Sequence, residues 1–217
     1  EEGRRIYDNL QKSLVFLLPT NGAQSLVILV AVLFGLALPL DPVQILWINM
    51  VTAITLSLAL AYEPAEPDLM RRPPRDPRAS ILNREFLVRI GYVSILIAGA
   101  TMAVFYLARS WGWPTDEAQT MAVTMLALGQ AAYLFNARSL RESSIRADMI
   151  TGNPAVWVAI GIMLALQLVF VYAPFMNNWF GSAPLPVEGW ALPLGLSVVV
   201  FLLVEAGKAG FRRVVPA

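Results

Sequence analysis

Hydrophobic residues in this chain are gathered into six long runs, each separated from the next by a more polar segment. The runs cover residues 13–38, 43–62, 85–108, 118–135, 154–173 and 187–206. Each approaches the roughly twenty residues that an α-helix needs to cross about 30 Å of hydrocarbon. The pattern therefore predicts a single all-α integral membrane domain over residues 1–217, built as a bundle of six transmembrane helices.

Positive charges are distributed very unevenly between these runs. When the polar segments are assigned alternately to the two sides of the membrane, 15 of the 16 Lys and Arg residues fall on one side, and only Arg109 lies on the other. The positive-inside rule makes the populated side cytoplasmic. We therefore expect both termini to be cytoplasmic, with a cytoplasmic stalk helix at 1–12 and cytoplasmic loops at 63–84 and 136–153.

Composition agrees with a membrane protein and narrows its chemistry. Hydrophobic residues make up 57% of the chain and charged residues only 14%, with a formal net charge of +1. A lipid bilayer is the expected surrounding, and the near-neutral charge predicts no nucleic-acid partner. The chain has no Cys and no His, so disulfides and metal sites built from thiolate or imidazole are excluded within it.

Two polar segments outside the runs are candidates for contacts with a soluble domain. In the first twelve residues and just beyond, Ile6, Leu10 and Leu14 recur every four residues, which predicts a helix that continues into the first run. This extension is either a rigid lever or a terminus without a role. The segment 63–84 is rich in Pro and Arg, so it is either a stiff docking surface or an ordinary solvated connector.

Polar residues interrupt the first run near a third of its length. Pro19 cannot donate a hydrogen bond to the carbonyl of Val15, so this oxygen is predicted to be free. Asn21 and Gln24 follow and share one face of the helix, because they are three residues apart. An unpaired amide inside hydrocarbon costs several kcal/mol, so such residues are candidates for a binding site.

The second and fourth runs carry polar residues of the same kind. Asn49 and Thr52 repeat the spacing of three, and Gln130 lies near the middle of the fourth run. Amide, hydroxyl and freed carbonyl oxygens are suitable ligands for a partly dehydrated cation. The alternative is that these groups form hydrogen bonds between helices, as they commonly do in membrane bundles.

Several segments resemble one known family. The stretch EEGRRIYDNLQK, the Pro-Thr-Asn-Gly-Ala-Gln segment, PVQILWINMVTAI and AYEPAEPDLMRRPPR are similar to the fifth and sixth transmembrane helices and the following loop of P-type cation-transporting ATPases of the calcium and sodium/potassium pump branch. The last four runs, including LFNARSL, resemble the last four helices of that family. The resemblance covers essentially the whole chain.

The resemblance implies roles for particular residues. Asn21, Asn49 and Thr52 stand at matched positions of cation ligands, and the wider implied site also includes Gln24 and Gln130. Coupling or docking of the phosphorylated cytoplasmic domain is implied for four further residues: Tyr7, Pro73, Pro74 and Arg75.

Three positions depart from the calcium-pump pattern. Gln24 and Gln130 stand where that pattern has Glu, and Ala53 stands where it has Asp. Neutral amides cannot fully compensate a dehydrated divalent ion, so two calcium ions per cycle are not expected. Amides also do not bind and release protons, which disfavours proton countertransport through these positions. Calcium, sodium, potassium and other cations stay open as the transported ion.

The leading hypothesis is the membrane half of an ATP-driven cation pump in a bacterial plasma membrane. Its other half, with four helices and the cytoplasmic domains, would precede residue 1 and would use ATP and magnesium, whereas the 217 residues contain no phosphorylation motif or nucleotide site and are not expected to hydrolyse ATP alone. The alternatives are a stand-alone channel or secondary carrier, although no internal repeat is visible, and a purely structural helix bundle.

Overall fold

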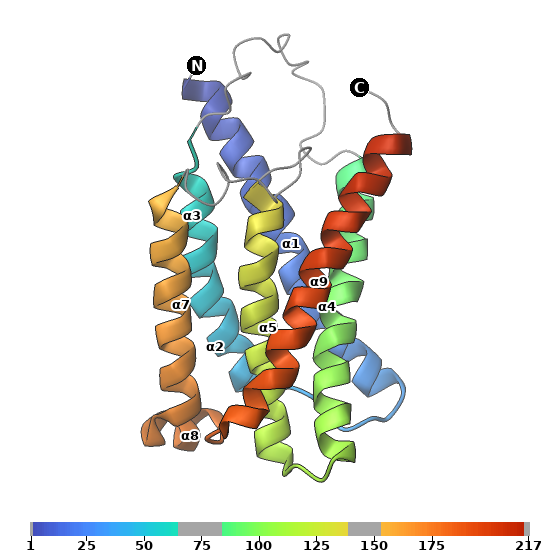
Figure 1. The fold of residues 1–217 in the computed structure, drawn as a ribbon, viewed down its shortest axis with the longest axis vertical. Coiled ribbons are helices and arrows are strands. Elements are labelled where there is room, and N and C mark those ends of the chain that lie inside the picture. Colours follow the sequence, from blue (N-terminus) through green and yellow to red (C-terminus); the bar gives the residue numbers. More distant parts are fainter. Residues whose placement is uncertain (1, 65–83, 139–152, 215–217) are drawn as a thin grey trace.

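The computed structural model is built from helices that run side by side along one direction (Figure 1). It describes residues 2–64, 84–138 and 153–214, and no strand occurs within these ranges. In chain order the elements are α1 (Glu2–Leu33), α2 (Pro42–Thr52), the π-helical segment η1 (Ala53–Ser57), α3 (Leu58–Ala61), α4 (Arg84–Ser110), α5 (Thr115–Arg138), α7 (Pro154–Tyr172), α8 (Pro174–Phe180) and α9 (Val187–Val214). The predicted all-α bundle is confirmed.

The two ends of the bundle differ in what they contain. At one end, which we call the connector end, α1 and α7 begin while α3, α5 and α9 end (Figure 1). The two long polar segments of the sequence start from this end, and both chain termini lie there. The opposite end, which we call the turn end, holds the short link between α4 and α5 and the helix α8.

The first helix includes the predicted stalk but ends earlier than the predicted span. It begins at Glu2 and continues without interruption through the expected stalk into the first hydrophobic run. It ends at Leu33 rather than Leu38, because Gly35 adopts a left-handed conformation with φ of 62°. The amide of Leu36 then donates to the carbonyl of Ala31 at 2.8 Å, which closes the helix in a Schellman-type cap.

The fifth hydrophobic run is followed by a helix that the sequence pattern did not predict. Pro174 opens α8 directly after α7, and Gly181 ends it with φ of 62°. Phe175 and Trp179 of α8 are exposed, at the turn end of the bundle (Figure 1). Exposed aromatic residues at such a position are typical of the boundary between membrane and water.

Among the described residues, five helical stretches are long and apolar enough to cross a membrane: Glu2–Leu33, Pro42–Ala61, Phe86–Ser110, Pro154–Tyr172 and Val187–Lys208. The remaining predicted span corresponds to α5, which is 24 residues long but less apolar. Nearly all of α5 is buried among α1, α2, α4, α7 and α9. Because its surface faces protein rather than lipid, it can carry more small and polar residues than the outer helices.

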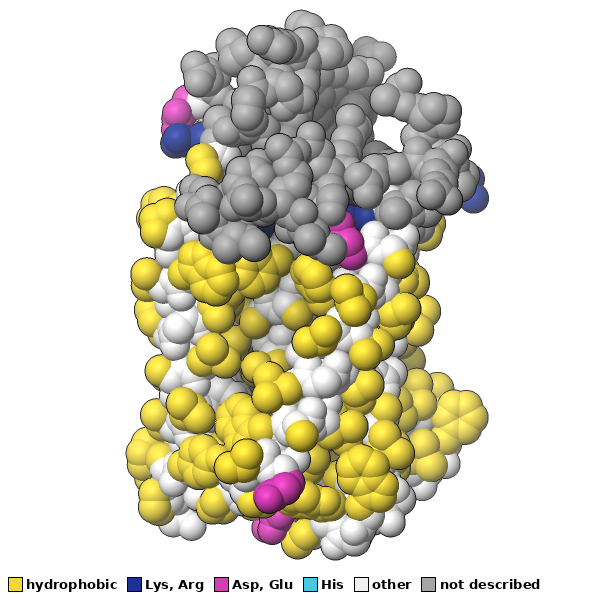
Figure 2. Space-filling model, viewed as in Figure 1, with side chains coloured by type: hydrophobic (Ala, Val, Ile, Leu, Met, Phe, Trp, Pro, Cys, Tyr) yellow, Lys and Arg dark blue, Asp and Glu magenta, His cyan; other side chains and the backbone are white. Residues whose placement is uncertain are grey.

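Large apolar side chains cover the outside of the bundle between its two ends (Figure 2). Leu46, Ile54, Ile95 and Val158 are each more than 60% exposed although they lie in the middle of helices. An apolar surface of this extent is unsuitable for water. Figure 2 also shows that the charged side chains visible on this face gather toward the ends, as expected for a membrane-spanning bundle.

Candidate functional site

Three of the five predicted cation ligands line one pocket between α1 and α2. The pocket has a volume of about 530 Å³, and Asn21, Gln24 and Asn49 contribute its amide groups. Its other lining residues are Ser25, Ile28, Leu29, Val32 and Ile45. Asn21 is exposed and Asn49 half-buried, whereas Gln24 is buried. The first predicted pair, Asn21 and Gln24, therefore faces the same space as Asn49 of the second pair.

The other two predicted ligands do not line this pocket. Thr52 is buried on α2, and its hydroxyl donates to the carbonyl of Ile48 at 2.8 Å. Gln130 is buried within α5 and fully shielded from solvent. The tertiary structure thus groups Asn21, Gln24 and Asn49 and leaves Thr52 and Gln130 outside the pocket lining.

Two of the buried amides have no hydrogen-bond partner. Both polar atoms of Gln24, which is only 3% exposed, and both polar atoms of Gln130 are unpaired within the described part of the chain. Leaving a buried polar group unpaired costs about 1–3 kcal/mol. A cost of this size at a predicted ligand position favours a binding site, because a bound ion or a neighbouring polar group would pair with the amide and offset the cost.

The expectation that Pro19 leaves the carbonyl of Val15 free for a cation is wrong. This oxygen accepts a hydrogen bond from the hydroxyl of Tyr133 at 2.8 Å. The carbonyl of Pro19 itself accepts one from the hydroxyl of Ser94 at 3.1 Å. These two hydrogen bonds connect α1 around Pro19, which we call the proline break, to α5 and α4. The polar groups of the described pocket are therefore side chains rather than freed carbonyls.

The second span is irregular directly after Thr52. Residues Ala53–Ser57 form a π-helical turn between α2 and α3. The hydroxyls of Thr52 and Thr55 each bond back to the carbonyl four residues earlier, at 2.8 and 2.7 Å. Single π turns are frequent at functional sites, so this irregularity supports a functional role for the segment beside the pocket. The pattern of apolar residues did not predict this π-helical turn.

The pocket contains no ionisable side chain among its lining residues. Within the described ranges, no group of three or more His, Cys, Asp or Glu residues is placed to hold a metal ion. Ala53, at the position of a family carboxylate, is exposed on the surface of the chain. The described half of the site consequently offers neutral oxygens to a cation.

The predicted coupling residues are only partly within the described structure. Tyr7 lies on the first part of α1 and is half-buried. Pro73, Pro74 and Arg75 fall in the segment 65–83, outside the described residues. Their proposed docking role stays a prediction.

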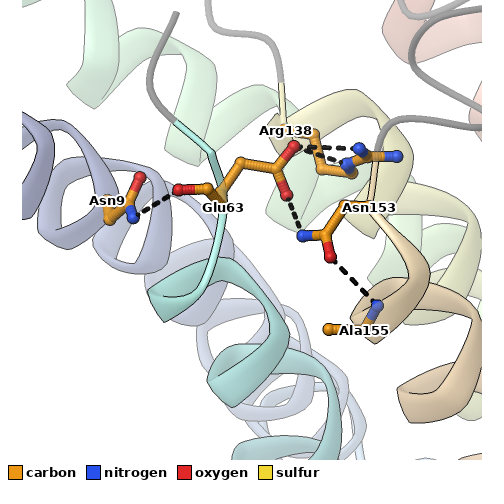
Figure 3. A network of polar contacts seen from close by, with 5 residues as sticks. All are labelled: Asn9, Glu63, Arg138, Asn153 and Ala155. Carbon is orange, nitrogen blue, oxygen red and sulfur yellow. Dashed lines mark hydrogen bonds and ion pairs between the residues drawn. The ribbon is translucent and has the colours of Figure 1, made fainter.

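Sequence reasoning missed a polar network at the connector end (Figure 3). One carboxylate oxygen of Glu63 accepts hydrogen bonds from Nε and Nη2 of Arg138, each at 2.9 Å, and the other accepts one from the amide of Asn153 at 2.7 Å. Asn9 of α1 donates to the backbone carbonyl of Glu63 at 2.9 Å. The network therefore joins α1, the end of α3, α5 and the start of α7.

A second polar group on the other side of α5 ties it to α4 and α9. Arg89 donates to the carbonyl of Asn136 at 2.8 Å, and the amide of Asn136 donates to Glu205 at 2.9 Å. Lys208 lies 3.5 Å from the same carboxylate.

The sequence does carry a trace of these two polar groups. The segment LFNARSL places polar residues at the boundary of an apolar run. For Asn153, which caps α7 by accepting a hydrogen bond from the amide of Ala155, the signal was its position directly before Pro154.

Comparison with known proteins decides the family. Residues 37–210 match the family model described as "Cation transporting ATPase, C-terminus". The chain belongs to this family. It is therefore the C-terminal membrane part of a P-type cation-transporting ATPase, as the resemblance in the sequence implied.

Individual relatives agree with the family model. The chain is 38% identical over 206 residues to "Probable cation-transporting ATPase F" of Mycobacterium tuberculosis, which covers 94% of this chain and 22% of that protein. It is 35% identical over 199 residues to "Cation-transporting ATPase pma1" of Synechocystis, with 89% and 22% covered. It is 34% identical over 206 residues to "Calcium-transporting ATPase" of Bacillus subtilis, with 94% and 23% covered. The chain thus spans less than a quarter of the length of these relatives.

Proposed function

We propose that this chain contributes part of the intramembrane ion site of an ATP-driven cation pump. The observation that carries the proposal is the pocket between α1 and α2, where three amide side chains converge and the buried Gln24 amide has no partner in the described structure. Family membership supports the pump over a channel or a secondary carrier. The unpaired amide argues against a purely structural bundle, in which such groups would bond to one another.

The remaining parts of the pump follow from this proposal. ATP and Mg²⁺ would act in cytoplasmic domains of the full-length protein, and a second set of membrane helices would complete the site. The connector end would face the cytoplasm of a bacterial cell, with the bundle in the plasma membrane, since most of the positive charge lies between the runs on that side. The continuous helix α1 would then connect the cytoplasmic domains to the pocket.

The lack of charge in the pocket lining also affects the charge and the number of cations that it can bind. A divalent ion needs anionic compensation, and the described lining supplies none. We propose that a single cation per cycle uses these amides, with any carboxylate ligand provided by the other half of the site.

The test is the ATPase activity of the purified full-length protein against a panel of cations, followed by the variant Asn49→Ala. We expect one or a few cations to stimulate the wild-type protein and the variant to lose most of this stimulation while it stays monodisperse. The matched control is Asn177→Ala at the turn end, whose amide bonds to the Val171 carbonyl and Ser182 instead of lining the pocket. Unchanged stimulation in Asn49→Ala would remove Asn49 from the site, and a wild-type protein without cation-stimulated activity would overturn the proposed function.

A further inference from the structure

We propose that Tyr133 is a positioning residue for the ion site, because its hydroxyl replaces the hydrogen bond that Pro19 removes from α1. This inference rests on the proposed function of the pocket. Tyr133 belongs to α5, lies outside the pocket lining and is itself no cation ligand.

The need for such a residue follows from the covalent structure of proline. Residue 19 of a regular helix would donate its N–H to the carbonyl of Val15, but proline has no N–H. Val15 is fully buried, so its oxygen cannot turn to water. In a membrane bundle an orphan carbonyl must find a donor from a neighbouring helix.

The hydroxyl of Tyr133 is this donor, and the surrounding side chains hold its ring in one position. Its hydroxyl lies 2.8 Å from the carbonyl oxygen of Val15, 118 positions away in the sequence. Its ring is fully buried and stacks on Phe16, with 6.0 Å between centroids and 14° between planes. The side chain of Arg89 interacts with the same hydroxyl from α4. The hydroxyl is therefore held at the Val15 carbonyl by a short hydrogen bond and by a ring that is buried and stacked.

The opposite side of the break is packed just as closely. Ser94 donates to the carbonyl of Pro19 at 3.1 Å, and a Cβ added at Gly22 would lie only 2.6 Å from the Ser94 oxygen. Asn21 and Gln24 follow Pro19 within the next two turns of the same helix. The hydrogen bond from Tyr133 thus fixes the direction of the helix that carries two of the three pocket amides.

The experiment is a double-mutant cycle in the full-length protein, with Tyr133→Phe, Pro19→Ala and the pair. Tyr133→Phe keeps the ring and its stacking but removes the donor. We expect it to raise the cation concentration for half-maximal ATPase stimulation about three- to tenfold, while maximal turnover changes less than twofold. Pro19→Ala restores an N–H for the Val15 carbonyl, so adding Tyr133→Phe to it should change the half-maximal concentration less than twofold.

The control is Tyr106→Phe, which removes a hydroxyl that also donates to a backbone carbonyl at 2.8 Å, that of Ala37, away from the break. We expect it to behave as the wild type. Equal effects of Tyr133→Phe with and without Pro19→Ala, or an effect no larger than that of Tyr106→Phe, would overturn the inference.

Thermal unfolding of the same four proteins separates this inference from the proposed function. If Tyr133→Phe lowers the melting temperature or the yield, Pro19→Ala must restore most of the loss. This readout needs no cation, so it still tests the link between Tyr133 and Pro19 if the wild-type protein shows no cation-stimulated ATPase activity. Additive changes in melting temperature would contradict the link.

Discussion

At the scale of single residues, the candidate site is defined by amides rather than carboxylates. Asn21, Gln24 and Asn49 meet in one pocket, and Gln24 is buried without a partner in the described structure. Their spacing of three along each helix predicted that each pair shares a face. It could not predict which face looks into the pocket: Asn49 lines it, whereas Thr52, three residues later, does not. Gln130, included in the implied site because of the family resemblance, also lies outside the lining.

A prediction at the residue scale concerns how cation affinity depends on pH when Gln24 is replaced by a carboxylate. An amide neither binds nor releases a proton near neutral pH, whereas a carboxylate binds a proton and a cation in competition. In the full-length variant Gln24→Glu, the apparent cation affinity relative to wild type should therefore increase about tenfold as the pH rises from about 5.5 to about 8. Cation titrations of ATPase activity at several pH values measure this ratio. Gln24→Asn serves as the control and should show a constant ratio; a constant ratio in Gln24→Glu would mean that this side chain does not meet the ion.

At the scale of elements, the helices are held together by polar contacts at the connector end as well as by apolar packing. Glu63 receives hydrogen bonds from α5 through Arg138 and from the start of α7 through Asn153, while Asn9 of α1 bonds to its backbone (Figure 3). All four residues are buried. A buried carboxylate and guanidinium that satisfy each other favour one particular arrangement of the four segments, since either charge alone would be strongly unfavourable there.

This network gives a prediction for stability. Glu63→Gln keeps the size of the side chain but removes the carboxylate that Glu63 offers to Arg138, a residue that is only 2% exposed. We expect the free energy of unfolding to fall by about 3–5 kcal/mol, measured by equilibrium unfolding in mixed detergent micelles.

The control for this prediction is Glu2→Gln, which removes the carboxylate from the exposed ion pair with Arg5 on the first turn of α1. Solvent-exposed pairs contribute little to stability, so this variant should unfold like the wild type. A Glu63→Gln variant that is as stable as Glu2→Gln would show that the ion pair contributes nothing to the arrangement of the helices.

At the scale of the whole molecule, the bundle has one chemically distinct end. The described residues that flank both long polar segments, and the first and last described residues, lie at the connector end (Figure 1). Asp41, Asp116, Glu117 and Glu188 belong to the turn end. The positive-inside rule then predicts that the connector end is cytoplasmic.

Orientation can be measured by labelling single cysteines with a membrane-impermeant maleimide. In full-length protein freed of its native cysteines, Ser110→Cys at the turn end should be labelled in intact cells. Gly3→Cys at the connector end should be labelled only after the membrane is permeabilised. Both positions are exposed in the structure, so accessibility to the reagent depends on the side of the membrane. The reverse pattern would overturn the predicted orientation.

The sequence by itself determined the helical membrane fold and the approximate positions of the spans. A helix in hydrocarbon must satisfy its backbone hydrogen bonds within its own segment and present apolar side chains over about twenty residues, so both requirements leave a local trace in the chain. The family membership was also readable, because motifs such as PVQILWINMVTAI are local. Local signals were weaker at boundaries, where Gly35 ended α1 early and Pro174 opened the unpredicted α8.

Only the tertiary structure decided which polar groups satisfy one another. The carbonyl freed by Pro19 is occupied by a hydroxyl 118 positions away, and Glu63 pairs with Arg138 across 75 positions. Such pairings depend on how helices distant in sequence are packed and rotated against each other, and hydrophobic periodicity does not encode a particular partner. The same packing left the amide of Gln24 unpaired at the pocket, and this places the candidate ion site on amide side chains rather than on a freed carbonyl.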